Sequence, residues 1–137
     1  MTTYVLDACA LLALLKGEKG AQEIDNLFRQ AASGDVALCM SIVNLLEVYY
    51  GFAGDIGIAK TEDMLNSIEK TPLVVIDTIS RKAYREAARL KATYRISIAD
   101  CIGLATASEL SGQFVSSDHH ELDAVGERED IPFFWFR

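Results

Sequence analysis

The stretch that decides the fold is Tyr4–Leu15, which reads YVLDACALLALL. Its first three residues form a short apolar run typical of a buried strand, and the part from Cys9 onward has the apolar content of a buried helix. Asp7 lies at the junction and is the only charged residue of the stretch. A strand that leads directly into a helix predicts a β–α unit, which needs a parallel partner strand further along the chain.

The same alternation continues outward from this segment to the C-terminus. Besides Tyr4–Leu6, apolar runs predict strands at Ala37–Met40, Leu73–Ile76, Phe114–Val115 and Phe133–Trp135. Helical patterns lie between them at Cys9–Leu15, Ala21–Ala32, Ile42–Phe52, Ile58–Ile68, Ser80–Tyr94 and Ile98–Leu110. Strands separated by helices predict an α/β fold with a parallel sheet covered on both faces. Sites in such folds lie beyond the carboxyl ends of the strands.

The length and composition predict a single domain, residues 1–137. Half of the residues are apolar and 24% are charged, which is typical of a globular protein. The longest apolar run, Ala8–Leu15, is far shorter than the roughly 20 residues that span a bilayer, so we expect no membrane association. The three cysteines lie among apolar residues, as buried thiols in a reducing cytosol do. We therefore expect a cytoplasmic protein.

The charge distribution bears on nucleic-acid binding. The net charge of −7 argues against a broad nucleic-acid surface. Six of the 13 basic residues, however, lie between Arg81 and Arg95. If this segment is helical, Arg81, Arg85 and Arg89 form a row along one face. Such a row is either a solvated helix face or a set of phosphate or partner contacts, and the sequence leaves both open.

Four carboxylates stand alone in apolar surroundings at or near predicted strand ends: Asp7, Glu47, Asp100 and Asp118. An isolated carboxylate among apolar residues is costly unless it is paired or binds a cation. Four that converge would repel one another, and a divalent cation relieves that repulsion. Oxygen ligands without histidine or cysteine favour Mg²⁺ or Mn²⁺ over zinc.

Each acid also has a purely structural explanation. Asp7 is positioned to cap the helix that follows it, and Glu47 can point to solvent from an amphipathic helix. Two S/D-x-x-D/E spacings resemble capping boxes: Ser97 with Asp100, and Asp118 with Glu121. Asp77 also follows an apolar run, and we interpret it as the cap or leading turn of the basic helix. His119 and His120 are either phosphate contacts or exposed residues of a loop or helix start.

Four segments together resemble the PIN-domain ribonucleases, specifically the VapC-type toxins. The quoted N-terminal stretch and the GEKGA loop at 17–21 are similar to the family's first strand, acid, helix and loop. The segments SIVNLLEVYYG at 41–51, SIADCIGLA at 97–105 and FVSSDHHEL at 114–122 resemble those that carry the second, third and fourth acids. All four occur in order and with ordinary spacing.

The resemblance implies a three-layer α/β/α fold with a central, mainly parallel sheet of about five strands. It implies that the four acids hold one or two Mg²⁺ or Mn²⁺ ions, which activate water for attack on an RNA phosphodiester. It also implies a homodimer and a cognate antitoxin that blocks the site. The chain departs from many family members in having Ala8 and Cys9, rather than serine or threonine, just after the first acid.

Several further residues are candidates for supporting roles. Asn44 lies one helical turn before Glu47 and either holds a metal-bound water or phosphate, or packs in the core. Ser116 is the hydroxyl two residues before Asp118. Tyr50 and Phe52 end the Glu47 helix in a strongly apolar hairpin, so we expect them to form part of a groove for an amphipathic antitoxin segment.

Two other functions fit parts of the pattern. A phosphatase or phosphotransferase with an aspartyl nucleophile would typically have a second aspartate two residues after the first, where this chain has Cys9. A catalytically inactive PIN-fold protein-binding module would keep the fold and a partner surface without metal-dependent cleavage. Metal binding that depends on the acids separates the nuclease from such a module.

Overall fold

The computed structural model describes residues 1–137 and contains five strands and seven helices. In chain order these are β1 (Thr2–Leu6), α1 (Ala8–Lys16), α2 (Ala21–Ala32), β2 (Val36–Ser41), α3 (Ile42–Ile56), α4 (Ile58–Glu69), β3 (Val74–Ile76), α5 (Arg81–Thr93), α6 (Ile98–Glu109), β4 (Gln113–Ser116), α7 (His119–Arg128) and β5 (Phe133–Trp135).

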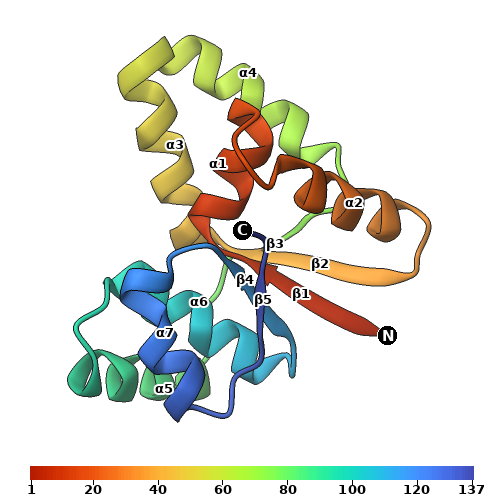
Figure 1. The fold of residues 1–137 in the computed structure, drawn as a ribbon. Coiled ribbons are helices and arrows are strands. Elements are labelled where there is room, and N and C mark those ends of the chain that lie inside the picture. The colour runs from red at the N-terminus through yellow and green to blue at the C-terminus, as the bar shows by residue number, and fades with distance from the viewer.

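The five strands form one sheet with β1 at its centre. The strand order is β3-β2-β1-β4-β5, and every neighbouring pair is parallel. Figure 1 shows α1 to α4 on one side of the sheet and α5 to α7 on the other, so the molecule has three layers. The predicted α/β/α fold with a central parallel sheet of about five strands is therefore confirmed.

Alternation along the strands divides the core between the two faces. Val5 packs in a cluster with buried residues of α5, α6 and α7, whereas the next residue, Leu6, packs with those of α1 to α4. Successive side chains of a strand point to opposite faces, so a doubly covered sheet needs apolar residues at every position. This explains why the central strands read as unbroken apolar runs.

The structure corrects the sequence-based elements in three places. The ten-residue helix α7 was not predicted, because only Leu122 and Val125 of its residues are buried and the rest is strongly polar. Helix α3 continues to Ile56, four residues past the predicted end, and stops at Gly57 with a φ of 86°. Ser80, rather than Asp77, caps α5.

The sequence also led us to expect buried, unpaired cysteines and no membrane-spanning segment. All three cysteines are free; Cys39 and Cys101 are buried and Cys9 is half-buried. None of the seven helices combines the length and apolar character that a membrane span requires.

Candidate active site

Asp7 is the most buried carboxylate of the candidate site. It follows β1 directly and caps α1, since its Oδ1 accepts a hydrogen bond from the Ala10 N–H at 2.8 Å. The predicted capping role is thus confirmed. Asp7 is only 2% exposed, and this burial raises its pKa from 3.8 to about 7, although hydrogen bonds from Ser116 and Ala10 oppose the shift.

Ser116 connects Asp7 to Asp118 across two neighbouring strands. Its hydroxyl, fully buried at the end of β4, donates to Asp7 Oδ2 at 2.5 Å and accepts from the Asp118 N–H at 3.2 Å. These contacts exist because β1 and β4 pair in parallel, so that their carboxyl ends meet. Asp118 in turn caps α7 by accepting from the Glu121 N–H at 3.3 Å.

The four predicted acids line one pocket at the carboxyl edge of the sheet. This acidic pocket has a volume of about 380 Å³ and is lined by Asp7, Ala8, Cys9, Glu47, Ser97, Asp100, Asp118 and Glu121. Glu47 comes from α3 and Asp100 from the first turn of α6, where the Ser97 hydroxyl accepts a hydrogen bond from the Asp100 N–H. No lysine or arginine lines the pocket, so its carboxylates have no neutralising partner there.

The environment of these carboxylates opposes their ionisation. Burial is the main cause that raises the pKa of Asp100, with further contributions from the charges of Asp118 and Glu121, while a hydrogen bond from Ser97 opposes the shift. The pKa of Glu47 is also raised, first by burial and then by the charge of Asp100. A divalent cation among them would reverse both effects, since it favours the charged form of each carboxylate.

The donor set fits a hard divalent cation, since it consists of carboxylate and hydroxyl oxygens. The side chains do not form a ready-made coordination cage, because no three acidic, histidine or cysteine side chains are grouped closely enough to hold one ion. Mutual repulsion keeps uncompensated carboxylates apart.

Comparison with known proteins identifies the family. The sequence profile described as PIN domain matches residues 4–127. This chain belongs to the PIN domain family. A comparison with curated protein sequences finds no match.

The fold of this PIN domain is similar to solved structures of low sequence identity. It matches DNA-bound VapBC from Salmonella typhimurium with a TM-score of 0.73 and 17% identity over 100% of both chains. VapBC2 from Rickettsia felis, bound to a promoter DNA fragment, gives a TM-score of 0.73 and 17% identity over 98% of each chain. A toxin–antitoxin complex from Klebsiella pneumoniae gives a TM-score of 0.61 and 20% sequence identity, and the match covers 89% of this chain and 92% of that chain.

Asn44 does not reach the acidic pocket in this PIN domain. Its side chain is fully buried, and neither its amide nitrogen nor its carbonyl oxygen has a hydrogen-bond partner. It lies between α3 and α6, where a Cβ on Gly103 would come within 2.7 Å of its Oδ1. The placement favours the packing role over contact with a metal-bound water.

Four residues that line the acidic pocket were not predicted as site residues: Ala8, Cys9, Ser97 and Glu121. Glu121 lies one helical turn after Asp118. The three-residue spacing that resembles a capping box also places the Glu121 side chain on the same side as Asp118, where it lines the pocket. Cys9 takes the position of the missing hydroxyl residue. Burial and the nearby carboxylates raise the pKa of its thiol to about 12, so it stays protonated and contributes no charge.

The basic row lies on α5, away from the acidic pocket. Arg81 and Arg85 are exposed and make no ion pair. Arg89 donates to Glu86 at 2.7 Å and to Glu129 at 2.5 Å, so this arginine is already neutralised within the chain. The role of the row in binding RNA or a partner stays a prediction, and only its first two members have free charges.

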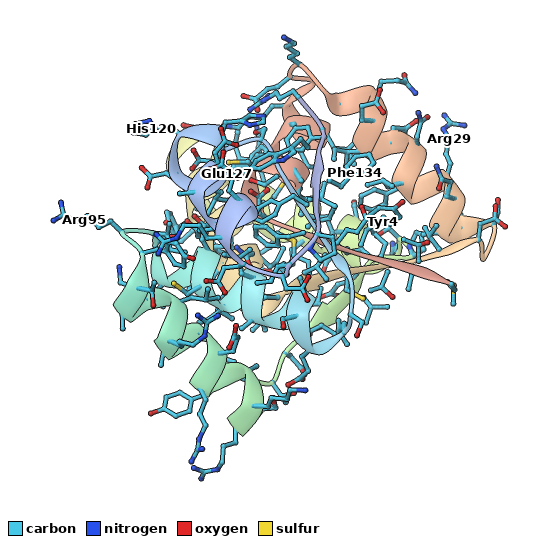
Figure 2. All side chains as sticks on the ribbon, turned by 60° about the horizontal axis from the view of Figure 1, so that its bottom comes forward. Tyr4, Arg29, Arg95, His120, Glu127 and Phe134 are labelled. Carbon is cyan, nitrogen blue, oxygen red and sulfur yellow. The ribbon has the colours of Figure 1, made fainter.

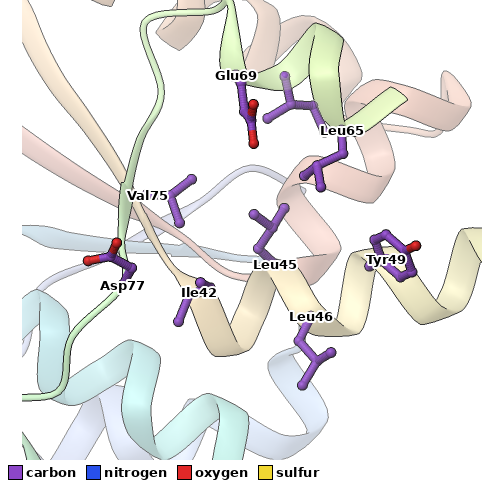
Figure 3. Close-up of a pocket in the computed structure, with 9 residues that line it drawn as sticks. Ile42, Leu45, Leu46, Tyr49, Leu65, Glu69, Val75 and Asp77 are labelled. Carbon is purple, nitrogen blue, oxygen red and sulfur yellow. The ribbon is translucent and has the colours of Figure 1, made fainter. Parts of the chain in front are cut away.

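An apolar pocket of about 370 Å³ opens between α3, α4 and the edge strand β3. Figure 3 shows Ile42, Leu45 and Val75 facing this space, with Asp77 at its margin. Asp77 therefore borders an apolar pocket and does not join the acidic one. Tyr50 is 61% exposed nearby on α3, whereas Phe52 packs against the α1–α4 core and lies 5.3 Å from the Lys16 ammonium.

The two histidines lie at the start of a helix, as one of the two interpretations expected. His119 is the first residue of α7, and its Nδ1 and Nε2 lie 2.9 Å from Asp123 Oδ1 and from the Arg137 carbonyl oxygen. These two acceptors raise the pKa of His119. His120 is exposed and points outward from the molecule (Figure 2).

Proposed function

We propose that this PIN domain is a metal-dependent endoribonuclease that acts as the toxin of a toxin–antitoxin pair. One observation carries the proposal: four carboxylates, two on helices α3 and α6 and two that follow strands β1 and β4, line a single pocket that contains no basic residue. Keeping such carboxylates together without a counter-ion costs free energy. A site that binds Mg²⁺ or Mn²⁺ offsets that cost through the bound ion.

The proposed ligands are Asp7, Glu47, Asp100 and Asp118, holding one or two ions. A bound Mg²⁺ or Mn²⁺ supplies Lewis-acid stabilisation of phosphate charge and lowers the pKa of coordinated water. Asp7 is the rigid member, because the Ser116 hydroxyl and the Ala10 N–H hold its two oxygens. Glu47 and Asp100 line the same pocket from α3 and α6. Ser116 thereby acts as a supporting residue that orients Asp7.

The toxin role draws on the structures that the chain resembles. They are described as VapBC assemblies and as a toxin–antitoxin complex, and they match this chain over nearly its whole length. A VapC-type toxin would act on RNA and would be inhibited by its antitoxin. The net charge of −7 and the acidic pocket suit an inhibitor that places a basic side chain among the carboxylates.

The decisive experiment is cleavage of defined single-stranded RNA by the purified chain with Mg²⁺ or Mn²⁺, with and without EDTA. We expect cleavage that EDTA abolishes and that Glu47→Gln removes, because a mid-helix glutamate has no capping role. Glu23→Gln, an exposed glutamate on α2, is the matched control and should retain full activity. Saturable Mn²⁺ binding without cleavage, or cleavage that survives both EDTA and Glu47→Gln, would reject the nuclease. An inactive binding module predicts neither cleavage nor metal binding that depends on the acids.

The proposed antitoxin surface is the α3–α4 hairpin. Tyr50, Ile56 and Ile58 are 61%, 41% and 66% exposed, which is unusual for large apolar residues so close together in the chain. An amphipathic antitoxin segment would cover them. Tyr50→Ala should weaken co-purification of the antitoxin, whereas Leu110→Ala, an exposed apolar residue after α6, should not. Phe52→Ala tests the fold as well, because Phe52 packs in the core.

A homodimer is the proposed oligomeric state. The layer of α5 and α6 exposes Ile79, Tyr84 and Ile98 by 47%, 60% and 64% around a shallow apolar cavity. A second copy of the chain would bury this surface. Ile98→Glu should convert the dimer to a monomer in analytical ultracentrifugation. Ile58→Glu, an equally exposed isoleucine on α4, is the control that should leave the dimer intact.

A further inference from the structure

A series of aromatic rings runs from the core to His119, the residue that follows Asp118. Phe133 packs edge-on against the fully buried Phe114, with centroids 5.8 Å apart. The Trp135 ring is stacked with Phe133 at 4.8 Å, and His119 is stacked with Trp135 at 4.0 Å and an interplanar angle of 22°. The side chain of His119, at the outer end of this series, is 48% exposed.

The edge of the His119 ring is already occupied. Nδ1 and Nε2 both lie at hydrogen-bond distance from acceptors within the chain, the Asp123 carboxylate and the Arg137 carbonyl oxygen. Neither nitrogen is therefore free to contact a phosphate or to transfer a proton to a substrate. One face of the ring lies on Trp135. The exposed part of the ring is accordingly its other face and its carbon edge.

His119 is the chain neighbour of a proposed ligand of the reaction centre. His119 directly follows Asp118, which lines the acidic pocket together with Glu121. A nucleic-acid strand whose phosphate lies in that pocket meets carboxylates and no lysine or arginine there. Stacking of a base on an aromatic ring supplies binding energy that does not depend on phosphate charge, in addition to what a bound cation in the pocket would supply.

We propose that His119, held flat against Trp135, is a stacking platform for the nucleobase next to the phosphodiester that is cleaved. The ligand class is an unpaired base of single-stranded RNA. This inference rests on the proposed nuclease function. It assigns His119 a positioning role: it contacts the substrate base and takes no part in proton transfer.

The test measures RNA binding in the Glu47→Gln background, where cleavage is absent, with Mg²⁺ present. The probes are an eight-nucleotide single-stranded RNA and a set of the same RNA with one abasic site at each position in turn. We expect one position at which loss of the base weakens binding at least fivefold. His119→Gln should weaken binding of the intact RNA by the same factor and should make the abasic substitution at that position harmless.

Two further variants separate stacking from other roles. His119→Phe keeps an aromatic ring and loses both polar contacts, so it should bind RNA nearly as tightly as the parent protein. His120→Ala changes the exposed neighbour and should have no effect. In the cleavage-competent protein, His119→Gln should raise KM at least fivefold and leave kcat within about twofold.

The opposite pattern would overturn the proposal. Normal binding by His119→Gln with weak binding by His119→Phe would show that the ring nitrogens matter and the ring face does not. Equal binding by all His119 variants, with cleavage by the unmutated chain intact, would reject the platform and leave the nuclease standing. No RNA binding by the parent protein would reject both. The thermal midpoint of each variant in EDTA identifies any loss caused by unfolding.

Discussion

Replacing Asp7 with asparagine tests whether the ionised Asp7 carboxylate destabilises the fold when no metal ion is bound. The pKa of Asp7 is 3.8 in an unfolded chain and about 7 in the fold, because burial disfavours the charged form. Between these pH values the folded state holds a proton that the unfolded state releases. The free energy of unfolding therefore falls as pH rises from about 4 to 7, by roughly 1.4 kcal/mol per pH unit and by about 4 kcal/mol in total.

Asp7→Asn removes this dependence and keeps the helix cap, since asparagine caps about as well as aspartate. In EDTA, we expect the variant to be more stable than the parent chain by up to about 4 kcal/mol at pH 8 and by about 2 kcal/mol at pH 5. Urea unfolding at pH 5, 6, 7 and 8 measures the difference. Asp63→Asn, an exposed aspartate on α4, is the control and should give no pH-dependent difference.

Added Mn²⁺ should reduce the stability advantage of the variant at pH 8. An ion that binds only the folded parent chain stabilises it by about 3 kcal/mol at 100 times the dissociation constant, whereas the variant lacks a ligand and should gain much less. A parent chain that is more stable than Asp7→Asn at pH 8 in EDTA, or a difference that does not change with pH, would refute the reasoning about burial. Equal stabilisation of both proteins by Mn²⁺ would show that Asp7 is not a ligand.

Three further predictions address other parts of the molecule. Asp100→Asn keeps the Ser97 cap, so cleavage should fall about 100-fold or more while stability in EDTA is unchanged or higher; full activity would assign Asp100 to capping alone. Reversing the charges of Arg81 and Arg85 together should weaken RNA binding across sequences and lower its salt dependence, measured as the slope of log K against log salt; an unchanged slope would make them a solvated face. Gly103→Ala should destabilise the fold by about 1–3 kcal/mol in urea unfolding, because its Cβ would lie 2.7 Å from side chains of α3 and β4, whereas Gly51→Ala, with open space around it, should stabilise by up to about 1 kcal/mol.

Local patterns were enough to locate most of the fold. Apolar runs bounded by polar turns identified all five strands, since each strand of a doubly covered sheet must be apolar at successive positions. Helix α7 was not predicted because its apolar face consists of only two buried residues. The end of α3 was misplaced because Gly51 and Gly54 lie inside the helix, where glycine is tolerated at a cost that packing offsets.

The sequence by itself determined the chemistry of the candidate site, because a lone carboxylate in an apolar segment is visible without any coordinates. Only the tertiary structure decided which groups meet. The pairing of β1 with β4 brings Ser116 to Asp7 across 109 positions, and Glu129, the residue that follows α7, lies against α5 and neutralises Arg89. The stack of His119 on Trp135 likewise depends on β5 lying at the edge of the sheet. Periodicity and propensity act over a few residues, whereas strand order and side-chain burial depend on contacts between segments that no local pattern encodes.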